Sequence, residues 1–580
     1  MWNSATRRVS EPIRFADCSR GVIVARILSF SGSAFTILLA LHLCLTALTA
    51  HTFFDDSMMF YRYAIHMHQS HVIAWNPGGP PVFGVTSIPW LLLVWGGRFF
   101  IADPSRLLVS LSCATGLLAF LLASVIISRN SRSGLLSRAS YVFPILGIPL
   151  LLNVHFSLSF ANGMETMLGL LANVLFVACV LRFARLPDTP ISLLLAAAGA
   201  FAVLTRPETV VCVILTPVLA WYLLVPRSRP RLPIFLYSGS LALLLGADLL
   251  FNVLYFRSAL PLSFYIKAVH GYEGYALYLN PFAYTTLFFG MSLFPLLAIV
   301  SFAQRRDLPM LAVFGIPLGL TLLYFLTVVQ IMGLGARYYV PFLPFVFLPA
   351  AHVIDAAMRD RSRGCLSGVR LVGIAITLIV SVDQFSDHIS GPLGTIVASR
   401  KLVYASPTFV TEADVRLAYL GNWWNMCLPV ARIAKRLPPG STIAASEVGL
   451  LGALAPETTV LDMAGLNDPQ IARNGFSMDY VLAAKPALIW LPHSDYTRIY
   501  GIFSSDPRLL ERYVLYAGAF DFGLAVRRDL PPDSPVVLAV KQVWAETYPG
   551  VEINRYVVQR VMWNPAPASR EMRSVIAAHP

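Results

Sequence analysis

Two adjacent carboxylates, Asp55 and Asp56, stand at the end of the first long apolar run of this 580-residue sequence. Neighbouring ionised carboxylates repel each other, and each is costly to hold close to hydrocarbon. A chain that keeps both at this depth generally uses them for proton transfer, for a cation or for a counter-charge. The pair is therefore a candidate for a catalytic base, against the alternative of a solvated loop that happens to begin with acidic residues.

Further charged and polar residues fall at outer loops or outer ends of later apolar runs. Guanidinium and ammonium groups can neutralise a lipid-linked phosphate, and a carboxylate can deprotonate an attacking hydroxyl group. Together these groups suit transfer of a sugar from a lipid phosphate, a reaction that needs no nucleotide. The substrate-binding candidates are Arg62, Glu165, Arg206, Glu208, Tyr265, Lys267, Arg337 and Tyr338.

Several of these candidates also have a purely structural interpretation. Glu165 could cap the helix that begins beside it, because a carboxylate is favoured at a helix N-terminus. Arg206 and Glu208 could form an interfacial ion pair, and Arg337 could be an anchor that extends along Tyr338 towards the headgroups. The sequence leaves both interpretations open for each residue.

The composition describes a polytopic membrane protein. The chain is 56% apolar and only 13% charged, whereas soluble domains are roughly a quarter charged. The net charge of +13 comes largely from basic residues in short segments between apolar runs, which is the positive-inside pattern. The charge therefore indicates topology, and we expect no nucleic-acid partner.

The arginine-rich loops decide how the apolar runs are counted. Treating residues 86–102 as part of a first outer loop, about 51–106, places every later arginine cluster on the cytoplasmic side together with the N-terminus. Eleven transmembrane helices are then expected, and the C-terminus lies outside. The predicted spans are 27–50, 107–128, 139–158, 166–183, 190–204, 209–226, 232–253, 281–303, 310–332, 338–356 and 369–385.

From about residue 386 the chain becomes less apolar and its apolar runs shorten. Short β-like runs at 442–445, 459–461, 487–491 and 523–526 alternate with helix-length stretches such as 423–437. This alternation is typical of an α/β domain. We therefore predict a transmembrane catalytic module over 1–385 and an extracytoplasmic α/β domain over 386–580.

The order of the motifs resembles the GT-C superfamily of polyprenyl-phosphate-sugar glycosyltransferases. The acidic pair opens the first outer loop, as it does in that superfamily. Four further motifs look like those of the mycobacterial-type terminal β-arabinofuranosyltransferases and their bacterial relatives. These motifs are Trp75-Asn76-Pro77-Gly78, Gly163-Met164-Glu165-Thr166, Arg206-Pro207-Glu208 and Tyr265-Ile266-Lys267. A later segment, Asp462 to Pro469, resembles a further motif of those enzymes, although its polar residues could equally be turn residues.

The resemblance implies an enzyme that moves a sugar, arabinofuranose first, from a polyprenyl-phosphate donor to a cell-envelope glycan or glycoprotein. It implies Asp55 as the base, with Asp56 orienting the acceptor. The expected location is a bacterial cytoplasmic membrane, with membrane lipid as a partner and the reaction on the outer face. Trp75 and Asn76 join the substrate-binding candidates through their motif.

The resemblance also implies that the donor phosphate is bound by Arg206, Lys267 and Arg337. No obligatory cofactor is expected, and the cysteine and histidine spacing gives no metal site. The acidic pair leaves Mg²⁺ or Mn²⁺ open. Alternatives are a transporter or flippase of lipid-linked saccharides, a GT-C enzyme for another sugar such as mannose or aminoarabinose, and a non-catalytic glycan-binding scaffold.

Overall fold

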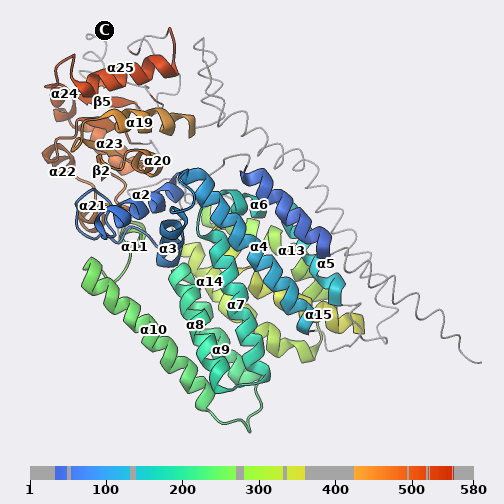
Figure 1. Ribbon diagram of the computed structural model, residues 1–580. Coiled ribbons are helices and arrows are strands. Elements are labelled where there is room, and N and C mark those ends of the chain that lie inside the picture. The colour runs from blue at the N-terminus through green and yellow to red at the C-terminus, as the bar shows by residue number, and fades with distance from the viewer. Residues whose placement is uncertain are drawn as a thin grey trace, which may run out of the picture.

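The computed structural model shows a helical bundle with a small α/β unit at one end (Figure 1). It describes residues 33–48, 54–130, 139–268, 280–328, 336–359, 424–492, 496–516 and 523–550, together with 330, 520 and 553. The predicted span 369–385 and the predicted domain boundary near 386 lie outside these residues.

The bundle is built from long apolar helices whose outward side chains are largely Leu, Phe and Val. A helix segment covers Ser33–Leu48. The others are α4 (Pro104–Asn130), α5 (Ala139–Leu152), α6 (Val154–Ala161), α7 (Thr166–Arg185), α8 (Thr189–Thr205), α9 (Val210–Leu223), α10 (Leu232–Phe256), α13 (Asn280–Phe302), α14 (Leu308–Thr327) and α15 (Pro344–Arg359).

Six helical segments in the described part are long and apolar enough to cross a membrane, or up to seven if a broken pair counts as one span. In that pair, α5 and α6 meet at a bend of 79°, where the Asn153 side chain accepts hydrogen bonds from the first amides of α6. The segments at 33–48, 189–205 and 207–223 are apolar but shorter than about 18 residues. The eleven-span count therefore stays a prediction, although helices lie at ten of its eleven positions.

The first outer loop contains two helices, α2 (Asp55–Ser70) and α3 (Ile88–Gly97). The polar residues 55–70, predicted to lie in the first outer loop, form a helix of about four turns whose inner side chains are buried. The segment 86–102 holds a helix of only ten residues, about half of what a membrane crossing needs. Both helices lie at the end of the bundle that carries the α/β unit (Figure 1).

Three junctions between helices at this end of the bundle carry the charged motifs. Glu165 directly precedes α7, Arg206 lies between α8 and the short 3-10 helix η1 (Pro207–Thr209), and Arg337 precedes the 3-10 helix η4 (Val340–Phe342). Helix α7 packs on α4, α8 and η4. The fold therefore brings together three motifs that are far apart in the chain.

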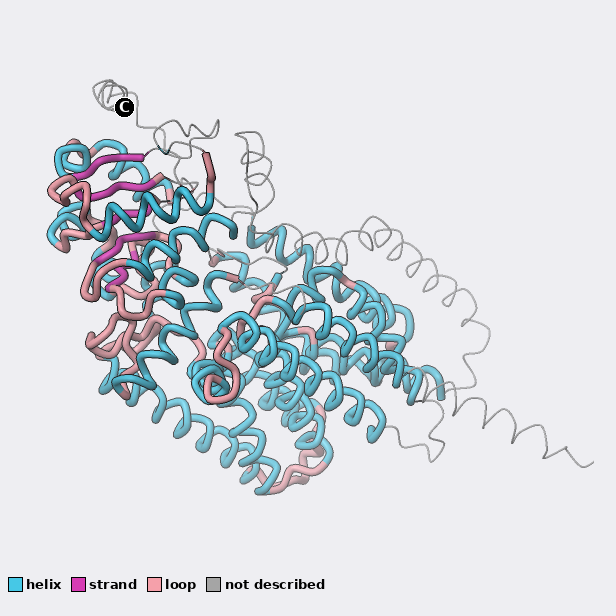
Figure 2. The backbone as a smooth tube through the Cα atoms, turned by 45° about the horizontal axis from the view of Figure 1, so that its top comes forward, coloured by secondary structure: helices cyan, strands magenta, loops and turns pink. Residues whose placement is uncertain are grey.

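The C-terminal unit is an α/β fold with a five-stranded mixed sheet, seen in magenta at one end of the molecule in Figure 2. Its strand order is β2-β1-β3-β5-β4; β1 is parallel to β2 and β3, and β5 is antiparallel to β3 and β4. The strands are β1 (Thr442–Ala445), β2 (Thr459–Asp462), β3 (Leu488–Trp490), β4 (Tyr513–Tyr516) and β5 (Leu524–Arg527).

The helices of this unit cover its sheet and make its contact with the bundle. Helix α20 packs against α2, and α21 packs against α11 (Leu262–Ala268). The helices are α19 (Trp424–Arg436), α20 (Gly449–Leu454), α21 (Pro469–Asn474), α22 (Met478–Ala483), α23 (Thr497–Ser505), α24 (Arg508–Arg512) and α25 (Pro535–Thr547). Four of the five strands lie at the positions that the sequence predicts; β4 was not predicted.

Candidate functional site

Three cations surround the ring of Tyr338 at the end of the bundle that carries the α/β unit. The guanidinium carbons of Arg206 and Arg337 lie 4.9 Å and 5.0 Å from the ring centroid, and the ammonium nitrogen of Lys267 lies 5.4 Å from it. An aromatic face attracts cations, and more strongly where water is excluded. The structure thus assembles all three predicted phosphate-binding residues around one buried ring.

Arg337 connects this cluster to the first outer loop. Its Nη2 donates to the Asp56 carboxylate at 2.7 Å and to the Tyr338 hydroxyl at 3.1 Å. Its Nε and Nη1 atoms are buried and have no hydrogen-bond partner among the described residues. Unpaired buried donors on a charged group are costly. They are therefore the strongest sign in the cluster that an anion completes it.

Arg206 forms a second buried pair on the other side of the Tyr338 ring. Its Nη1 donates to Glu165, and its Nη2 lies 3.4 Å from Glu208. Glu165 stands at the N-cap position of α7 without a side-chain hydrogen bond to the helix, and its carboxylate pairs with Arg206. One oxygen of each glutamate and Nε of Arg206 are buried without a partner in the described part of the chain. This pair is therefore also incompletely satisfied.

The site as a whole is nearly charge-balanced but divided into two sides. Arg206, Lys267 and Arg337 supply the positive side, and the carboxylates of Asp56, Glu165 and Glu208 face them. Buried charges persist only where partners or ligands compensate the loss of hydration. A snorkelling anchor would keep its guanidinium in water, whereas Arg337 is only 3% exposed. That interpretation of Arg337 is therefore wrong.

The two carboxylates of the acidic pair point to different partners. Asp55 is 3% exposed, and its two oxygens each accept a 2.7 Å hydrogen bond, from the amides of Gly449 and Leu450. Burial raises the pKa of Asp55 to about 6, and the two amide bonds partly oppose that rise. Asp56 keeps 21% of its side chain exposed and pairs with Arg337. Adjacent residues of a helix are about 100° apart around its axis, so the two side chains diverge.

Arg62 uses all of its donor nitrogens inside the protein. It donates to the carbonyl of Trp75 at 2.6 Å and to the carbonyls of Gly452, Ala455 and Thr458 at 2.8 Å, 3.0 Å and 2.8 Å. A further bond at 3.1 Å goes to the side chain of the predicted candidate Asn76. The side chain is fully buried. Arg62 therefore fastens the C-terminal unit to the first outer loop.

Trp75 and Asn76 make the same kind of contact. The indole nitrogen of Trp75 donates to the Val460 carbonyl at 2.9 Å. The Asn76 side chain accepts from the Val460 amide at 2.8 Å and donates to the Val460 carbonyl at 3.2 Å, as a neighbouring strand would. Because β2 is an edge strand, this amide covers otherwise unpaired backbone groups. The structure places these two residues at the interface, outside the cation cluster.

Tyr265 stands apart from the other predicted site residues. It is half-buried on α11, and its ring lies edge-to-face against Phe264 with the centroids 6.0 Å apart. Lys267, two residues further along α11, reaches the Tyr338 ring. The structure thus joins the lysine of this motif to the cluster and shows no such contact for its tyrosine.

Glu447 is a candidate that the motifs did not reveal. It follows β1, and its side chain is hydrogen-bonded to Tyr496; burial and the charges of Asp55, Asp56 and Asp462 hold its pKa well above the ordinary range. The residue is half-buried by surface exposure, so it lies at the edge of the enclosed region. The available signal was its place directly after a predicted strand of a parallel sheet, where ligands bind.

The later segment that begins at Asp462 has a structural role. Asp462 is fully buried and accepts hydrogen bonds from Ala464, Gly465 and Asn467, and Asp468 caps α21. The turn interpretation accounts for these residues. Among the described residues no group of three His, Cys, Asp or Glu side chains could hold a metal ion.

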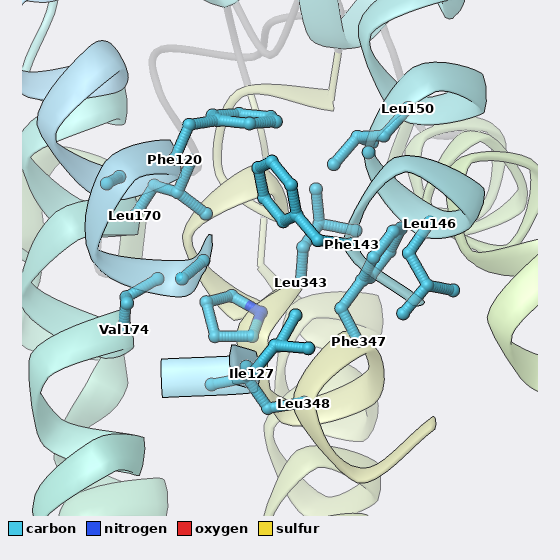
Figure 3. A pocket seen from close by; sticks show the side chains of 14 residues that line it. Phe120, Ile127, Phe143, Leu146, Leu150, Leu170, Val174, Leu343, Phe347 and Leu348 are labelled. Carbon is cyan, nitrogen blue, oxygen red and sulfur yellow. The ribbon is translucent and has the colours of Figure 1, made fainter. Parts of the chain in front are cut away.

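An apolar pocket lies inside the bundle, between α4, α5, α7 and α15 (Figure 3). Its wall is formed by Leu, Phe, Ile, Val, Ala, Gly and Pro residues only. On α7 it is lined by Leu170 and Val174, which lie five and nine residues after Glu165. A helix rises about 1.5 Å per residue, so these two levels lie roughly 8 Å and 14 Å along α7 from the charged site.

Comparison with solved structures shows that the fold of this chain is similar to that of a solved protein named ArnT. The chain matches ArnT from Cupriavidus metallidurans in the apo state with a TM-score of 0.50 and 16% identity, over 85% of this chain and 97% of that one. The structure of the same protein bound to undecaprenyl phosphate matches with a TM-score of 0.52 and 14% identity, over the same shares of 85% and 97%. At these identities the similarity concerns the fold.

Two further comparisons concern the sequence. Residues 413–524 match a family model described as "Domain of unknown function (DUF8728)". This region covers most of the C-terminal α/β unit, including β1, β2 and the loop of Glu447. The comparison with curated proteins gives no match.

Proposed function

We propose that this protein is a membrane glycosyltransferase that moves a sugar from a polyprenyl-phosphate donor to a cell-envelope glycan or glycoprotein. The observation that carries the proposal is Arg337, a buried guanidinium that holds Asp56 with one nitrogen and keeps two others unpaired. The reaction takes place at the outer face of a bacterial cytoplasmic membrane, where the first outer loop meets the C-terminal unit.

The cation cluster is the proposed site of the donor phosphate. Arg337 has two free donor atoms for phosphate oxygens, and Lys267 adds a second positive charge across the Tyr338 ring. Guanidinium groups bind phosphate through a fixed fork of donors, and ammonium groups bind it as point charges. Support comes from the related fold of ArnT, which has been solved bound to undecaprenyl phosphate.

The apolar pocket suits the hydrocarbon tail of such a donor. It lies along α7 below the charged site and has an entirely apolar wall (Figure 3). A polyprenyl chain that leaves the lipid for this pocket exchanges one apolar environment for another and meets no polar group there. A donor with its phosphate at the cation cluster and its tail in the apolar pocket therefore meets a surface of matching polarity at each end.

Asp56 is the proposed base, which reverses the roles expected from the sequence. Both oxygens of Asp55 already accept backbone hydrogen bonds, whereas Asp56 is partly exposed beside the phosphate-binding arginine. As the acceptor oxygen bonds to the anomeric carbon, the bond from that carbon to the phosphate oxygen breaks. The hydroxyl proton passes to Asp56, and polyprenyl phosphate leaves with the electron pair of the broken bond.

The transferred sugar is proposed to be arabinofuranose, because the motifs of the first outer loop and of α11 resemble those of arabinofuranosyltransferases. Aminoarabinose is the alternative, and it is compatible with the fold shared with ArnT. Parallel assays with the two radiolabelled lipid-linked sugars distinguish them. Transfer of only the aminoarabinose label would replace the proposed sugar.

The acidic pair provides the test of the mechanism. Asp56→Asn should lower kcat by about 10²- to 10⁴-fold, because it removes the general base. Since it also removes the counter-charge of the buried Arg337, rates are compared on purified protein that is shown to be folded. Asp55→Asn is the matched control. It should lower the unfolding temperature, because it weakens the hydrogen bonds from Gly449 and Leu450, and it should change kcat only slightly. Equal kcat for Asp56→Asn and wild type would overturn the assignment of the base. Label that only changes leaflet, without transfer, would overturn the enzyme in favour of a flippase.

A further inference from the structure

The loop of Glu447 lies at a special position of the C-terminal sheet. The sheet order is β2-β1-β3, with β1 parallel to both neighbours. From β1 the chain continues to β2 on one side of it, and from β2 it crosses back to β3 on the other side. The space between β1 and β3 is therefore the topological switch point. Open α/β sheets bind ligands there, outside the carboxyl ends of the strands. Glu447 is the second residue after β1, and its partner Tyr496 follows β3.

This edge of the sheet faces the catalytic module. The Gly449 and Leu450 amides donate to Asp55, and the Tyr63 hydroxyl donates to Asn467, which follows β2. Gly449 fits so closely that an added Cβ would overlap the Asp55 carbonyl. The sheet edge that normally receives a ligand thus opens onto the start of α2, where Asp56 lies.

Acidic groups gather on this side of the site. Asp55, Asp56 and Asp462 lie close enough to Glu447 for their charges to act on it. No Lys or Arg within the described ranges forms an ion pair with Glu447 in the way that Arg337 pairs with Asp56. The cations lie around Tyr338, and Arg337 joins them to this acidic group through Asp56. An anionic donor is drawn to the cations, which leaves the acidic side for a substrate without negative charge.

We propose that Glu447 of the C-terminal unit is a substrate-contacting residue that, together with Asp56, binds hydroxyl groups of the glycan acceptor. This inference rests on the proposed function and adds the acceptor subsite to it. The Asp56 carboxylate accepts hydrogen bonds from sugar hydroxyl groups. Glu447, whose raised pKa favours the protonated form, can accept with one oxygen and donate with its O–H. The C-terminal unit then completes the active site instead of only covering it.

The experiment compares Glu447→Ala with Glu457→Ala in the full-length protein in nanodiscs. Glu457 belongs to the same unit and accepts a 3.0 Å hydrogen bond from Gln69 of α2. Its substitution therefore tests the effect of disturbing the interface without changing the proposed acceptor subsite. The donor is radiolabelled polyprenyl-phosphate arabinofuranose, and the acceptor is the cell-envelope fraction of the source organism. Initial rates are measured against each substrate in turn, and undecaprenyl phosphate binding is followed by thermal stabilisation.

Glu447→Ala should raise the apparent KM for the envelope acceptor, or lower kcat/KM for it, by about 10- to 100-fold, because it removes both a donor and an acceptor that contact the substrate. The apparent KM for the donor and the stabilisation by undecaprenyl phosphate should stay at wild-type values, and Glu457→Ala should match wild type throughout. Equal acceptor kinetics of Glu447→Ala and wild type would overturn the subsite, as would equal losses in Glu447→Ala and Glu457→Ala. A wild-type protein that transfers neither the arabinofuranose nor the aminoarabinose label to the envelope would overturn the function proposal itself.

Discussion

Removal of the Arg62 guanidinium should release the C-terminal unit from the first outer loop. Arg62 lies on α2 and donates to the carbonyls of Gly452, Ala455 and Thr458, all in the C-terminal unit. Its guanidinium carbon also lies 4.8 Å from the ring centroid of Trp75. Arg62→Ala leaves three buried carbonyls in the C-terminal unit without their charged donor.

The expected magnitude follows from those three interface bonds. A hydrogen bond to a charged group contributes about 1.5–3 kcal/mol, and a buried acceptor left unpaired costs about 1–3 kcal/mol. The three bonds share one donor group and do not add independently. We therefore expect the docked state to lose about 3–5 kcal/mol, as when one partner of a buried charged contact is removed.

Hydrogen exchange measured by mass spectrometry in nanodiscs is the direct assay. A loss of about 4 kcal/mol raises the population of the undocked state roughly 1,000-fold, so amides in residues 446–462 should exchange correspondingly faster. Arg62→Lys should give an intermediate effect, because an ammonium has three donors and cannot reproduce the planar fork. Arg98→Ala is the control, since Arg98 donates to the Ala64 carbonyl of α2 but belongs to the bundle side.

Two results would refute this reasoning. One is unchanged protection of residues 446–462 in Arg62→Ala, which would mean that apolar packing alone holds the unit in place. The other is an equal loss of protection in Arg98→Ala, which would mean that the effect comes from α2 itself and not from the interface bonds.

Three further predictions concern packing, the donor site and pH. Gly452→Ala should weaken docking by about 1–3 kcal/mol, because the new Cβ would lie 2.7 Å from Cδ of Arg62; hydrogen exchange measures it. Arg337→Lys should weaken binding of undecaprenyl phosphate at least about tenfold through loss of the fork, seen as lost thermal stabilisation. Burial raises the pKa of Asp462 to about 7, although the hydrogen bonds from Asn467 oppose that rise. The folded state therefore holds this proton more tightly, and its contribution to stability falls as pH rises from about 4 to about 7. Asp462→Asn should remove that slope, up to about 1.4 kcal/mol per pH unit, in unfolding experiments over pH 4–8.

Each of these predictions has a contrary result. Wild-type exchange in Gly452→Ala would show that α2 and α20 have room to separate without cost. Wild-type lipid binding in Arg337→Lys would place the phosphate elsewhere. A stability difference between wild type and Asp462→Asn that does not change with pH would show that Asp462 has the same pKa in both folded and unfolded chains.

The roles within α2 show why the sequence could not assign the site fully. Asp55, Arg62 and His66 are separated by seven and four residues, which places them on one face of a helix. All three hydrogen-bond to the C-terminal unit. The same segment was expected to be a polar outer loop, and without its helical form the shared face is not visible. Asp56 falls outside that face and so reaches Arg337.

The local sequence was sufficient where an element depends on its own residues. The strand at 442–445 and the helix near 423–437 appear at their predicted positions as β1 and α19, because apolar β-branched runs and turn residues act over short distances. The charged motifs around Arg206 and Arg337 could likewise be found from their place at the ends of apolar runs.

By itself, the sequence determined that this is a membrane protein with an α/β C-terminal unit and charged groups gathered at one end of its helices. Hydropathy and charge patterns are properties of short segments, so they can be taken directly from the residues. Only the tertiary structure decided that Asp55 binds Gly449 and that Asp56 binds Arg337. Those pairings join residues hundreds of positions apart, and they depend on side-chain direction around α2 and on the docking of two separate units. That packing is the reason why Asp55 holds the C-terminal unit in place while Asp56 is left for the proposed chemistry.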